Sequence, residues 1–296
     1  IAAPGMTWEL FVMVVASCLT LQQPLGSCAN PPLAAVERAK PILLQQSGQA
    51  VDVALSAEAA LVWDVTTGQT LYQRRATTRR PVASLTKLLS ALAVRQSLGP
   101  EATVTVPPAV LVVQRQGADI TLPVGGQTSV RDLLAASLIA SANDAMVTLA
   151  VAAKNSEAAF VEFANIYAQQ LGLHDTKASN ATGLSGGDQY STAADVRRLI
   201  TLVHADPVLG PFLAQQKGIV QLVGGQRRTY HSTDKLLGTY LPILAAKTGY
   251  TTEAGENLVI ITEQGGRKLG AVILGSTNRF QDMKILVEWV NRNYTW

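Results

Sequence analysis

The sequence predicts an α/β (α+β) fold in which an antiparallel sheet is flanked by helices and a mainly helical subdomain is inserted. Three observations support this: a hairpin pattern near residue 60, three apolar segments at short spacing after residue 240, and helical periodicity between them. Strand–helix–strand order with hairpin-length connections at both ends favours antiparallel pairing. Because a two-stranded hairpin is rarely stable alone, the first hairpin is expected to join the last three strands.

The region before residue 56 is expected to be a leader followed by a linker. Leu10 to Leu21 is almost wholly apolar, which suits the core of a signal peptide and is short for a membrane span. Residues 1–29 are therefore predicted to be a signal peptide or, because Leu25-Gly26-Ser27-Cys28 resembles a lipoprotein box, a leader acylated on Cys28. Residues 30–55 are polar and contain Pro and Gln, which indicates a linker, and residues 56–296 form the expected folded domain.

A hairpin and a helix begin this domain. The hairpin is predicted from a strand over Ala60–Val65, a turn over Thr66-Thr67-Gly68 and a return strand from Leu71. The helix carries an S-x-x-K motif, Ser84-Leu85-Thr86-Lys87, with Pro81 just before it and apolar residues after it at helical spacing. Ser84 and Lys87 stand at positions i and i+3, so both side chains are expected on one face of the helix.

The middle of the chain is predicted to be mainly helical. A second motif, Ser141-Ala142-Asn143, falls within a helical pattern from Ser129 through Ala153, at a point where polar residues interrupt it. The other predictions are short strands or loops over 100–125, a helix over Phe160–Leu171 ended by Gly172, a loop over 178–191 and a helix over Ala193–Val203.

Three strands and a helix close the chain. They are predicted over Leu241–Thr248, Asn257–Thr262 and Leu269–Leu274, with glycine-containing turns between them, and over Phe280–Val290. The third motif, Lys247-Thr248-Gly249, ends the first of these strands.

The composition argues against several classes of function. The net charge of +3 is small and dispersed, so nucleic acid is not an expected partner. The three histidines, His174, His204 and His231, are far apart and none stands in a metal-ligand pattern, so neither a metal nor another cofactor is expected. Both cysteines, Cys18 and Cys28, lie in the leader, so no disulfide is expected in the folded domain.

Each motif alone is weak evidence for an active site, because the chain also contains a second copy of two of them. Ser232-Thr233-Asp234-Lys235 is another S-x-x-K, but Gly238 and Pro242 soon interrupt any helix after it. Ser276-Thr277-Asn278 is another S-x-N, but it follows Lys-Thr-Gly and stands just past a predicted strand. Helix context and chain order therefore select Ser84, Ser141 and Lys247.

The three motifs in this order resemble those of penicillin-binding proteins and β-lactamases. The surrounding residues resemble the D-alanyl-D-alanine carboxypeptidases, which are low-molecular-mass penicillin-binding proteins of the β-lactamase/DD-peptidase-like fold, over roughly residues 55 to 290. The segments that carry this resemblance are Arg79–Lys87, Ser141–Ala145, Leu171-Gly172-Leu173, Asp175-Thr176, Gly183-Leu184, Tyr190–Ala193, Lys247–Thr251, Ala254-Gly255 and Leu274-Gly275-Ser276. Many members carry a further β-rich C-terminal domain, which is not expected here because the chain ends at Trp296, directly after the last predicted helix.

The resemblance implies an acyl-enzyme mechanism on a serine. Ser84 would be the nucleophile and Lys87 its proton acceptor, because a serine hydroxyl needs a base and no histidine is placed to serve. Burial and the nearby charge of Lys247 would lower the pKa of Lys87 far enough for this role. Ser141 would relay a proton to the departing D-Ala amine.

The same resemblance assigns the substrate-binding residues. Asn143 would hold the peptide amide of the substrate and help to fix Lys87. Lys247 and Thr248 would bind the terminal carboxylate, and Gly249 would let the substrate backbone approach the strand. The backbone N–H groups of Ser84 and Tyr250 would form the oxyanion hole.

The expected function is therefore a serine-type D-Ala-D-Ala carboxypeptidase that removes the terminal D-alanine from peptidoglycan pentapeptides. Such an enzyme binds β-lactam antibiotics covalently and acts in peptidoglycan biosynthesis, remodelling and cell shape. We expect an exported bacterial protein of the periplasm or the outer face of the cytoplasmic membrane, with membrane contact only through a retained or lipidated leader.

Three other functions are compatible with parts of the sequence. A D,D-endopeptidase would cleave peptidoglycan cross-links on the same scaffold. A class A β-lactamase would need a deacylating glutamate, for which Glu162 is the nearest candidate, but this residue falls inside a predicted helix and reads as a surface residue. A non-catalytic peptidoglycan-binding module would not need the intact set of Ser84, Lys87, Ser141 and Lys247.

Overall fold

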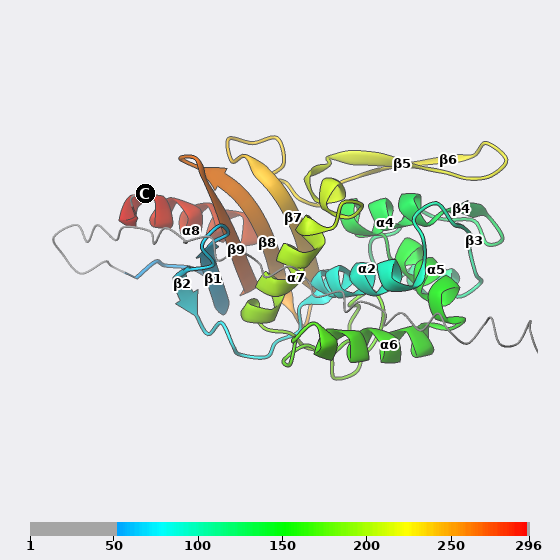
Figure 1. Cartoon of the computed structure of the whole chain (residues 1–296), viewed down its shortest axis with the longest axis horizontal. Helices are drawn as coiled ribbons and strands as arrows, with labels where there is room; N and C mark the ends of the chain where they lie inside the picture. The colour runs from blue at the N-terminus through cyan, green and yellow to red at the C-terminus, as the bar shows by residue number, and fades with distance from the viewer. Residues whose placement is uncertain (1–51, 295–296) are drawn as a thin grey trace, which may run out of the picture. The chain divides into compact units, whose positions relative to one another are not determined.

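The computed structural model describes residues 52–294, so the predicted leader, including Cys28, and nearly all of the predicted linker lie outside the described residues. An antiparallel sheet with strand order β2-β1-β9-β8-β7 organises the domain (Figure 1). Its strands are β1 (Ala59–Asp64), β2 (Thr70–Arg74), β7 (Ile243–Thr251), β8 (Gly255–Gln264) and β9 (Arg267–Ser276). The prediction that the first hairpin joins the last three strands is confirmed, through the pairing of β1 with β9.

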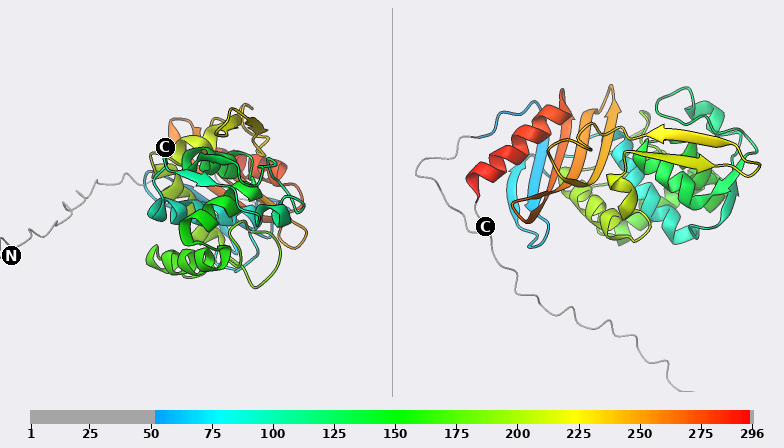
Figure 2. Two further views of the ribbon diagram at one scale, coloured as in Figure 1. Left: turned by 90° about the vertical axis from the view of Figure 1, so that its right-hand side faces the viewer. Right: turned by 90° about the horizontal axis from the view of Figure 1, so that it is seen from above.

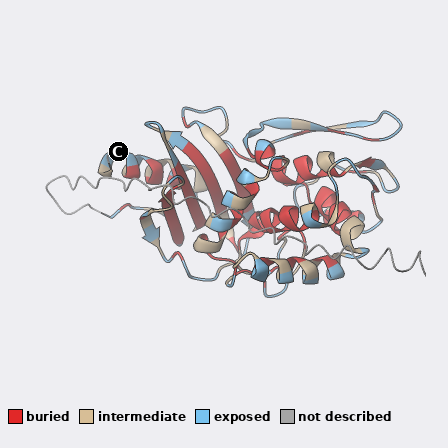
Figure 3. Ribbon diagram, viewed as in Figure 1, coloured by how far each residue is buried: buried red, intermediate tan, exposed pale blue. Residues whose placement is uncertain are grey.

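Each face of the sheet buries its own apolar cluster. Helix α8 (Arg279–Asn293) covers one face, with Met283, Leu286 and Val287 packed against side chains of β8 and β9. Helix α7 (Ala193–Ala205) contacts β1, β8 and β9 from the opposite face (Figure 2). The central strands are buried on both sides (Figure 3), which explains why they are nearly continuous apolar segments in the sequence.

The chain between β2 and β7 forms the inserted, mainly helical subdomain. It begins with a 3₁₀ turn, η1 (Ala83–Leu85), that leads directly into α2. The helices are α2 (Thr86–Ser97), α3 (Val110–Val113), α4 (Val130–Ile139), α5 (Asn143–Lys154) and α6 (Glu157–Gln170), followed by α7 and the 3₁₀ turn η2 (Gly210–Ala214). Helix α2 is buried among α4, α5, α6 and α7, so the nucleophile segment stands at the centre of the molecule's helical layer.

Two small two-stranded antiparallel sheets complete the subdomain. They pair β3 (Thr103–Thr105) with β4 (Gln127–Ser129) and β5 (Lys217–Gln221) with β6 (Arg227–His231). Within residues 52–294, no helix is long and apolar enough to cross a membrane.

The structure corrects two of the predicted elements and adds a hairpin. The helical pattern over Ser129–Ala153 is two helices, α4 and α5, because the chain breaks at Ser141, whose φ of +60° lies in the left-handed region. Ser84 does not lie in the α-helix itself but in η1, the 3₁₀ turn that leads directly into α2. The β5–β6 hairpin was not predicted, although Gly224-Gly225 at its tip is a hairpin turn signal.

Candidate active site

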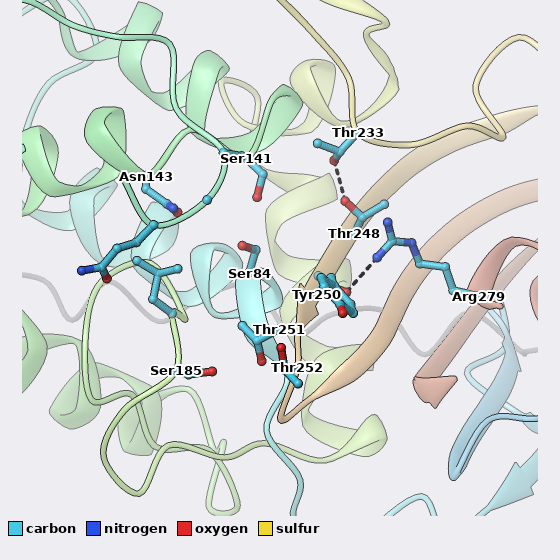
Figure 4. Close-up of a pocket in the computed structure, with 15 residues that line it drawn as sticks. Ser84, Ser141, Asn143, Ser185, Thr233, Thr248, Tyr250, Thr251, Thr252 and Arg279 are labelled. Atoms are coloured by element: carbon cyan, nitrogen blue, oxygen red, sulfur yellow. Dashed lines mark hydrogen bonds between the residues drawn. The ribbon is translucent and has the colours of Figure 1, made fainter. Parts of the chain in front are cut away.

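The three motifs meet at one pocket of about 520 Å³ between the end of β7 and the helical subdomain (Figure 4). Predicted site residues that line it are Ser84, Ser141, Asn143, Thr248, Gly249 and Tyr250. The remaining two, Lys87 and Lys247, are fully buried directly beneath the serines. All eight predicted site residues, separated by up to 166 positions in the sequence, are therefore brought together.

Close backbone packing fixes the position of Ser84. The preceding residue, Ala83, has a φ of +50°, so the chain turns sharply before the nucleophile. A Cβ on Gly183 would lie 2.0 Å from the carbonyl oxygen of Ala83, and a Cβ on Gly249 would lie 2.7 Å from that of Val82 and 3.1 Å from the backbone nitrogen of Ser84. Gly249 is thus required by the packing of the nucleophile segment on β7, a reason that the sequence did not reveal.

Lys87 lies within hydrogen-bond distance of the nucleophile. Its Nζ donates to Ser84 Oγ at 2.9 Å, to Asn143 Oδ1 at 2.7 Å and to the carbonyl oxygen of Thr182 at 2.8 Å. Burial, and secondly the charge of Lys247, lower the pKa of Lys87 well below its usual value. The three acceptors hold the amine in place, while burial makes the loss of its proton easier.

The second serine pairs with the second lysine. Lys247 Nζ donates to Ser141 Oγ at 2.9 Å and to the carbonyl oxygen of Thr248 at 2.9 Å. Ser141 occupies the break between α4 and α5, so its left-handed backbone turns the hydroxyl into the pocket. Burial, and secondly the charge of Arg279, lower the pKa of Lys247 to about 7.

Two residues that the sequence analysis did not select complete this side of the pocket. Thr233 forms a short hydroxyl–hydroxyl hydrogen bond with Thr248, and Arg279 Nη1 donates to the carbonyl oxygen of Gly249 at 2.9 Å (Figure 4). Thr233 belongs to the second S-x-x-K segment, whose serine and lysine do not line the pocket. Arg279 starts α8, so only the packing of that helix beside β7 shows its relation to the third motif.

The opposite wall of the pocket is formed by two loops. One carries Gln116, Gly117 and Ala118, and the other carries Leu184 and Ser185 from the loop predicted over 178–191. The carbonyl oxygen of Ala118 accepts from the backbone nitrogen of Asn143 at 2.8 Å, which ties the first loop to the second motif.

Ser276 and Glu162, which were considered as site residues and rejected on sequence grounds, lie outside the pocket. Ser276 binds Asp282 and Ser56 near the start of α8, and Glu162 is exposed on α6, as the sequence indicated. Among residues 52–294, no cluster of three or more His, Cys, Asp or Glu side chains is arranged to hold a metal ion.

Comparison with known proteins agrees with this geometry. The sequence model of the family described as D-alanyl-D-alanine carboxypeptidase matches residues 45–278. The D-alanyl-D-alanine carboxypeptidase DacD of Escherichia coli (strain K12) is 30% identical over 250 residues, which cover 79% of this chain and 63% of that protein. A D-alanyl-D-alanine endopeptidase of Pseudomonas aeruginosa is 31% identical over 250 residues, covering 83% of this chain and 80% of that protein.

Solved structures share the fold. The crystal structure of the Streptomyces K15 DD-transpeptidase superposes with a TM-score of 0.75 at 27% identity, covering 81% of this chain and 98% of that one. The D-alanyl-D-alanine carboxypeptidase of Mycobacterium tuberculosis H37Rv gives a TM-score of 0.76 at 27% identity, covering 86% and 96%. The predicted fold class is thereby confirmed. With a family match over most of the chain, relatives at 30% identity and the three motifs assembled at one pocket, this chain belongs to the D-alanyl-D-alanine carboxypeptidase family.

Proposed function

We propose that this protein is a serine-type D-Ala-D-Ala carboxypeptidase that removes the terminal D-alanine from peptidoglycan pentapeptides through an acyl-enzyme on Ser84. The observation that carries the proposal is the 2.9 Å contact between Lys87 Nζ and Ser84 Oγ, at a buried amine whose pKa is lowered. Such a contact gives a serine hydroxyl the base that it needs to act as a nucleophile.

Acylation begins with proton transfer from Ser84 to neutral Lys87. Ser84 Oγ attacks the carbonyl carbon of the penultimate D-Ala, and the carbonyl oxygen takes up the negative charge. The backbone N–H groups of Ser84 and Tyr250 would stabilise this oxyanion, and the close approach of β7 to the backbone nitrogen of Ser84 supports their convergence.

The leaving amine then needs a proton. Ser141 is the proposed relay, because its hydroxyl lines the pocket and accepts a hydrogen bond from Lys247. As Ser141 gives its own proton to the amine, it takes up the proton that Lys87 removed from Ser84, so Lys87 becomes neutral again and Lys247 keeps its charge for the carboxylate. D-Ala departs, and water hydrolyses the ester on Ser84 to release the shortened peptide.

Specificity for a chain end would come from the cationic side of the pocket. Lys247 and Arg279 provide positive charge near Thr248, whose hydroxyl is held by Thr233. A free carboxylate is the group that such an arrangement binds best. Asn143 would orient the peptide amide of the substrate from the opposite side, while its Oδ1 fixes Lys87.

The proposal includes the location and the cellular process in which enzymes of this family act. The protein would act on the outer side of the bacterial cytoplasmic membrane, in peptidoglycan remodelling and cell shape, and β-lactams would acylate Ser84. The predicted leader would direct its export.

A D,D-endopeptidase activity is the second candidate. The relative from Pseudomonas aeruginosa carries that name and is matched over 80% of its length, more than the 63% matched in the carboxypeptidase DacD. An endopeptidase cleaves a D-Ala bond whose distal side continues into a second stem peptide, so it depends less on the carboxylate anchor.

A labelled penicillin tests the nucleophile. We expect a stable adduct that peptide mapping by mass spectrometry places on Ser84 and that is absent in Ser84→Ala. A label on Ser232, or no label on the folded protein, contradicts the assignment. Release of free D-Ala from a pentapeptide, compared with cleavage of cross-linked muropeptides, then separates the two candidate activities.

A further inference from the structure

A buried carboxyl group that the proposed steps do not use lies beside the cationic side of the pocket. Asp234 is 7% exposed and directly follows Thr233, the residue that holds Thr248. Its Oδ1 accepts from the backbone nitrogen of Leu236 at 2.9 Å. Across residues 52–294, its buried Oδ2 finds no hydrogen-bond partner, and neither does the buried Nε of Arg279. A buried polar atom without a partner is costly, so such atoms often mark a functional constraint.

The charges around Asp234 are those of the proposed anchor. Lys247 and Arg279 are the two cations that act on its carboxyl group, and Asp234 in turn acts on both. The negative charge of Glu256 also acts on the Arg279 guanidinium, and Glu256 Oε2 accepts a hydrogen bond from the Arg279 backbone nitrogen at 2.9 Å. Burial raises the pKa of Asp234, and the two cations only partly oppose that effect.

We infer that Asp234 is a positioning residue whose protonation state sets the net charge of the carboxylate anchor and so makes substrate affinity depend on pH. The inference rests on the proposed function. With Asp234 neutral, Lys247 and Arg279 present their full positive charge to the substrate. With Asp234 ionised, its negative charge competes with the terminal carboxylate of the peptide for the same two cations.

The sign of the effect follows from this competition. Affinity for a free carboxylate should be highest below the pKa of Asp234 and should fall as pH rises through it. By reciprocity, a bound carboxylate raises the pKa of Asp234, so binding should take up protons. Loss of the Lys247 proton also weakens binding, but only near its pKa of about 7, so the acidic range isolates Asp234.

The test measures binding without chemistry. Isothermal titration of a D-Ala-D-Ala peptide to the Ser84→Ala protein, from pH about 4 to about 6.5, gives the dissociation constant and its slope with pH. A second peptide that ends in a carboxamide lacks the charge and serves as the ligand control. We expect affinity for the free carboxylate to fall by roughly fivefold as Asp234 ionises, and affinity for the carboxamide to stay constant.

Asp234→Asn in the same Ser84→Ala background keeps the shape of the side chain and its acceptor for Leu236. We expect it to bind the free carboxylate tightly across the acidic range, with the pH slope and the proton uptake lost. Asp188→Asn is the matched control, because Asp188 is an exposed carboxylate that pairs with Lys177 on the loop beside Ser185. Its pH slope should equal that of Ser84→Ala alone.

Two results overturn the inference: an unchanged slope in Asp234→Asn, or an equal slope for the carboxamide peptide. If Asp234→Asn does not fold, Asp234→Ser provides the same comparison with a smaller side chain. Failure of the proposed function is a different result, namely no release of D-Ala and no penicillin adduct with the intact protein at any pH.

Discussion

Lys87 and Lys247 are both fully buried at the same pocket, yet their surroundings differ. Lys87 donates to three oxygens from three separate segments, and one of them is the hydroxyl oxygen of the nucleophile Ser84. Lys247 donates to one side chain, Ser141, and to the carbonyl oxygen of its own neighbour. Lys87 belongs to a helix beside the nucleophile, whereas Lys247 belongs to a strand edge beside Thr248 and Arg279.

This difference separates two tasks that one type of side chain performs. An amine held against a hydroxyl is placed to move a proton, and an amine at the end of a strand with a second cation nearby is placed to attract an anion. The two tasks are also coupled, because the positive charge of Lys247 lowers the pKa of Lys87. Substitution of Lys87 should therefore mainly slow acylation, and substitution of Lys247 should mainly weaken substrate binding.

The largest effect is expected for Lys87→Ala. Removal of a general base typically costs up to about 10⁴-fold, so acylation of Ser84 by penicillin should slow by roughly 10³-fold or more. The measurement is the rate of adduct formation by mass spectrometry. Lys235→Ala is the matched control, because Lys235 occupies the same position in the second S-x-x-K segment but is exposed. Equal and mild losses in both variants would contradict the role of Lys87.

Lys247→Ala should mainly weaken recognition of the carboxylate. Loss of a charge-assisted hydrogen bond should raise KM for a pentapeptide about 10- to 100-fold, with a smaller change in kcat. Steady-state release of D-Ala gives both constants. A fall in kcat as large as that of Lys87→Ala, at unchanged KM, would show that Lys247 acts in the chemical step and not in carboxylate binding.

The pH dependence of the acylation rate should report on Lys87, and the pH dependence of KM should report on Lys247. Lys87 acts as a base only when neutral, so the acylation rate should rise with pH and level off well below the usual pKa of a lysine. Lys247 binds a carboxylate only when protonated, so KM should increase as pH rises through about 7. Lys247→Arg keeps its charge over this range and should remove the rise in KM. A rise in KM that persists in this variant would assign the titration to another group.

Part of this site could be predicted from the sequence, because each motif is local. Ser84 and Lys87 are three residues apart across the junction of η1 and α2, so their contact follows from helical spacing. Lys247 stands on a strand long enough to be predicted from its apolar residues. The central strands were predicted well because both of their faces are buried. The β5–β6 hairpin was missed because its strands are short, each contains only one fully buried residue, and the apolar Ile219 is exposed.

The rest of the site depends on tertiary packing. Thr233 and Arg279 reach the pocket from segments 15 and 30 residues away from their partners, Thr248 and Gly249, and neither segment has a local pattern that points there. The break at Ser141 also has no glycine to mark it, since a serine adopts the left-handed backbone. The order of the motifs predicted which residues meet, but not which neighbours set their charge.

The smallest effect that still tests this comparison is expected for Thr233→Val. The variant keeps the volume of the side chain and removes the hydroxyl that holds Thr248, so Thr248 should turn more freely on the carboxylate side of the pocket. Loss of one neutral hydrogen bond should raise KM about two- to tenfold and leave acylation by Lys87 almost unchanged. Thr229→Val, at an exposed position on β6, is the matched control and should behave as the unaltered protein. A larger effect on kcat than on KM would show that Thr233 acts on the chemistry at Ser84 instead of on the anchor.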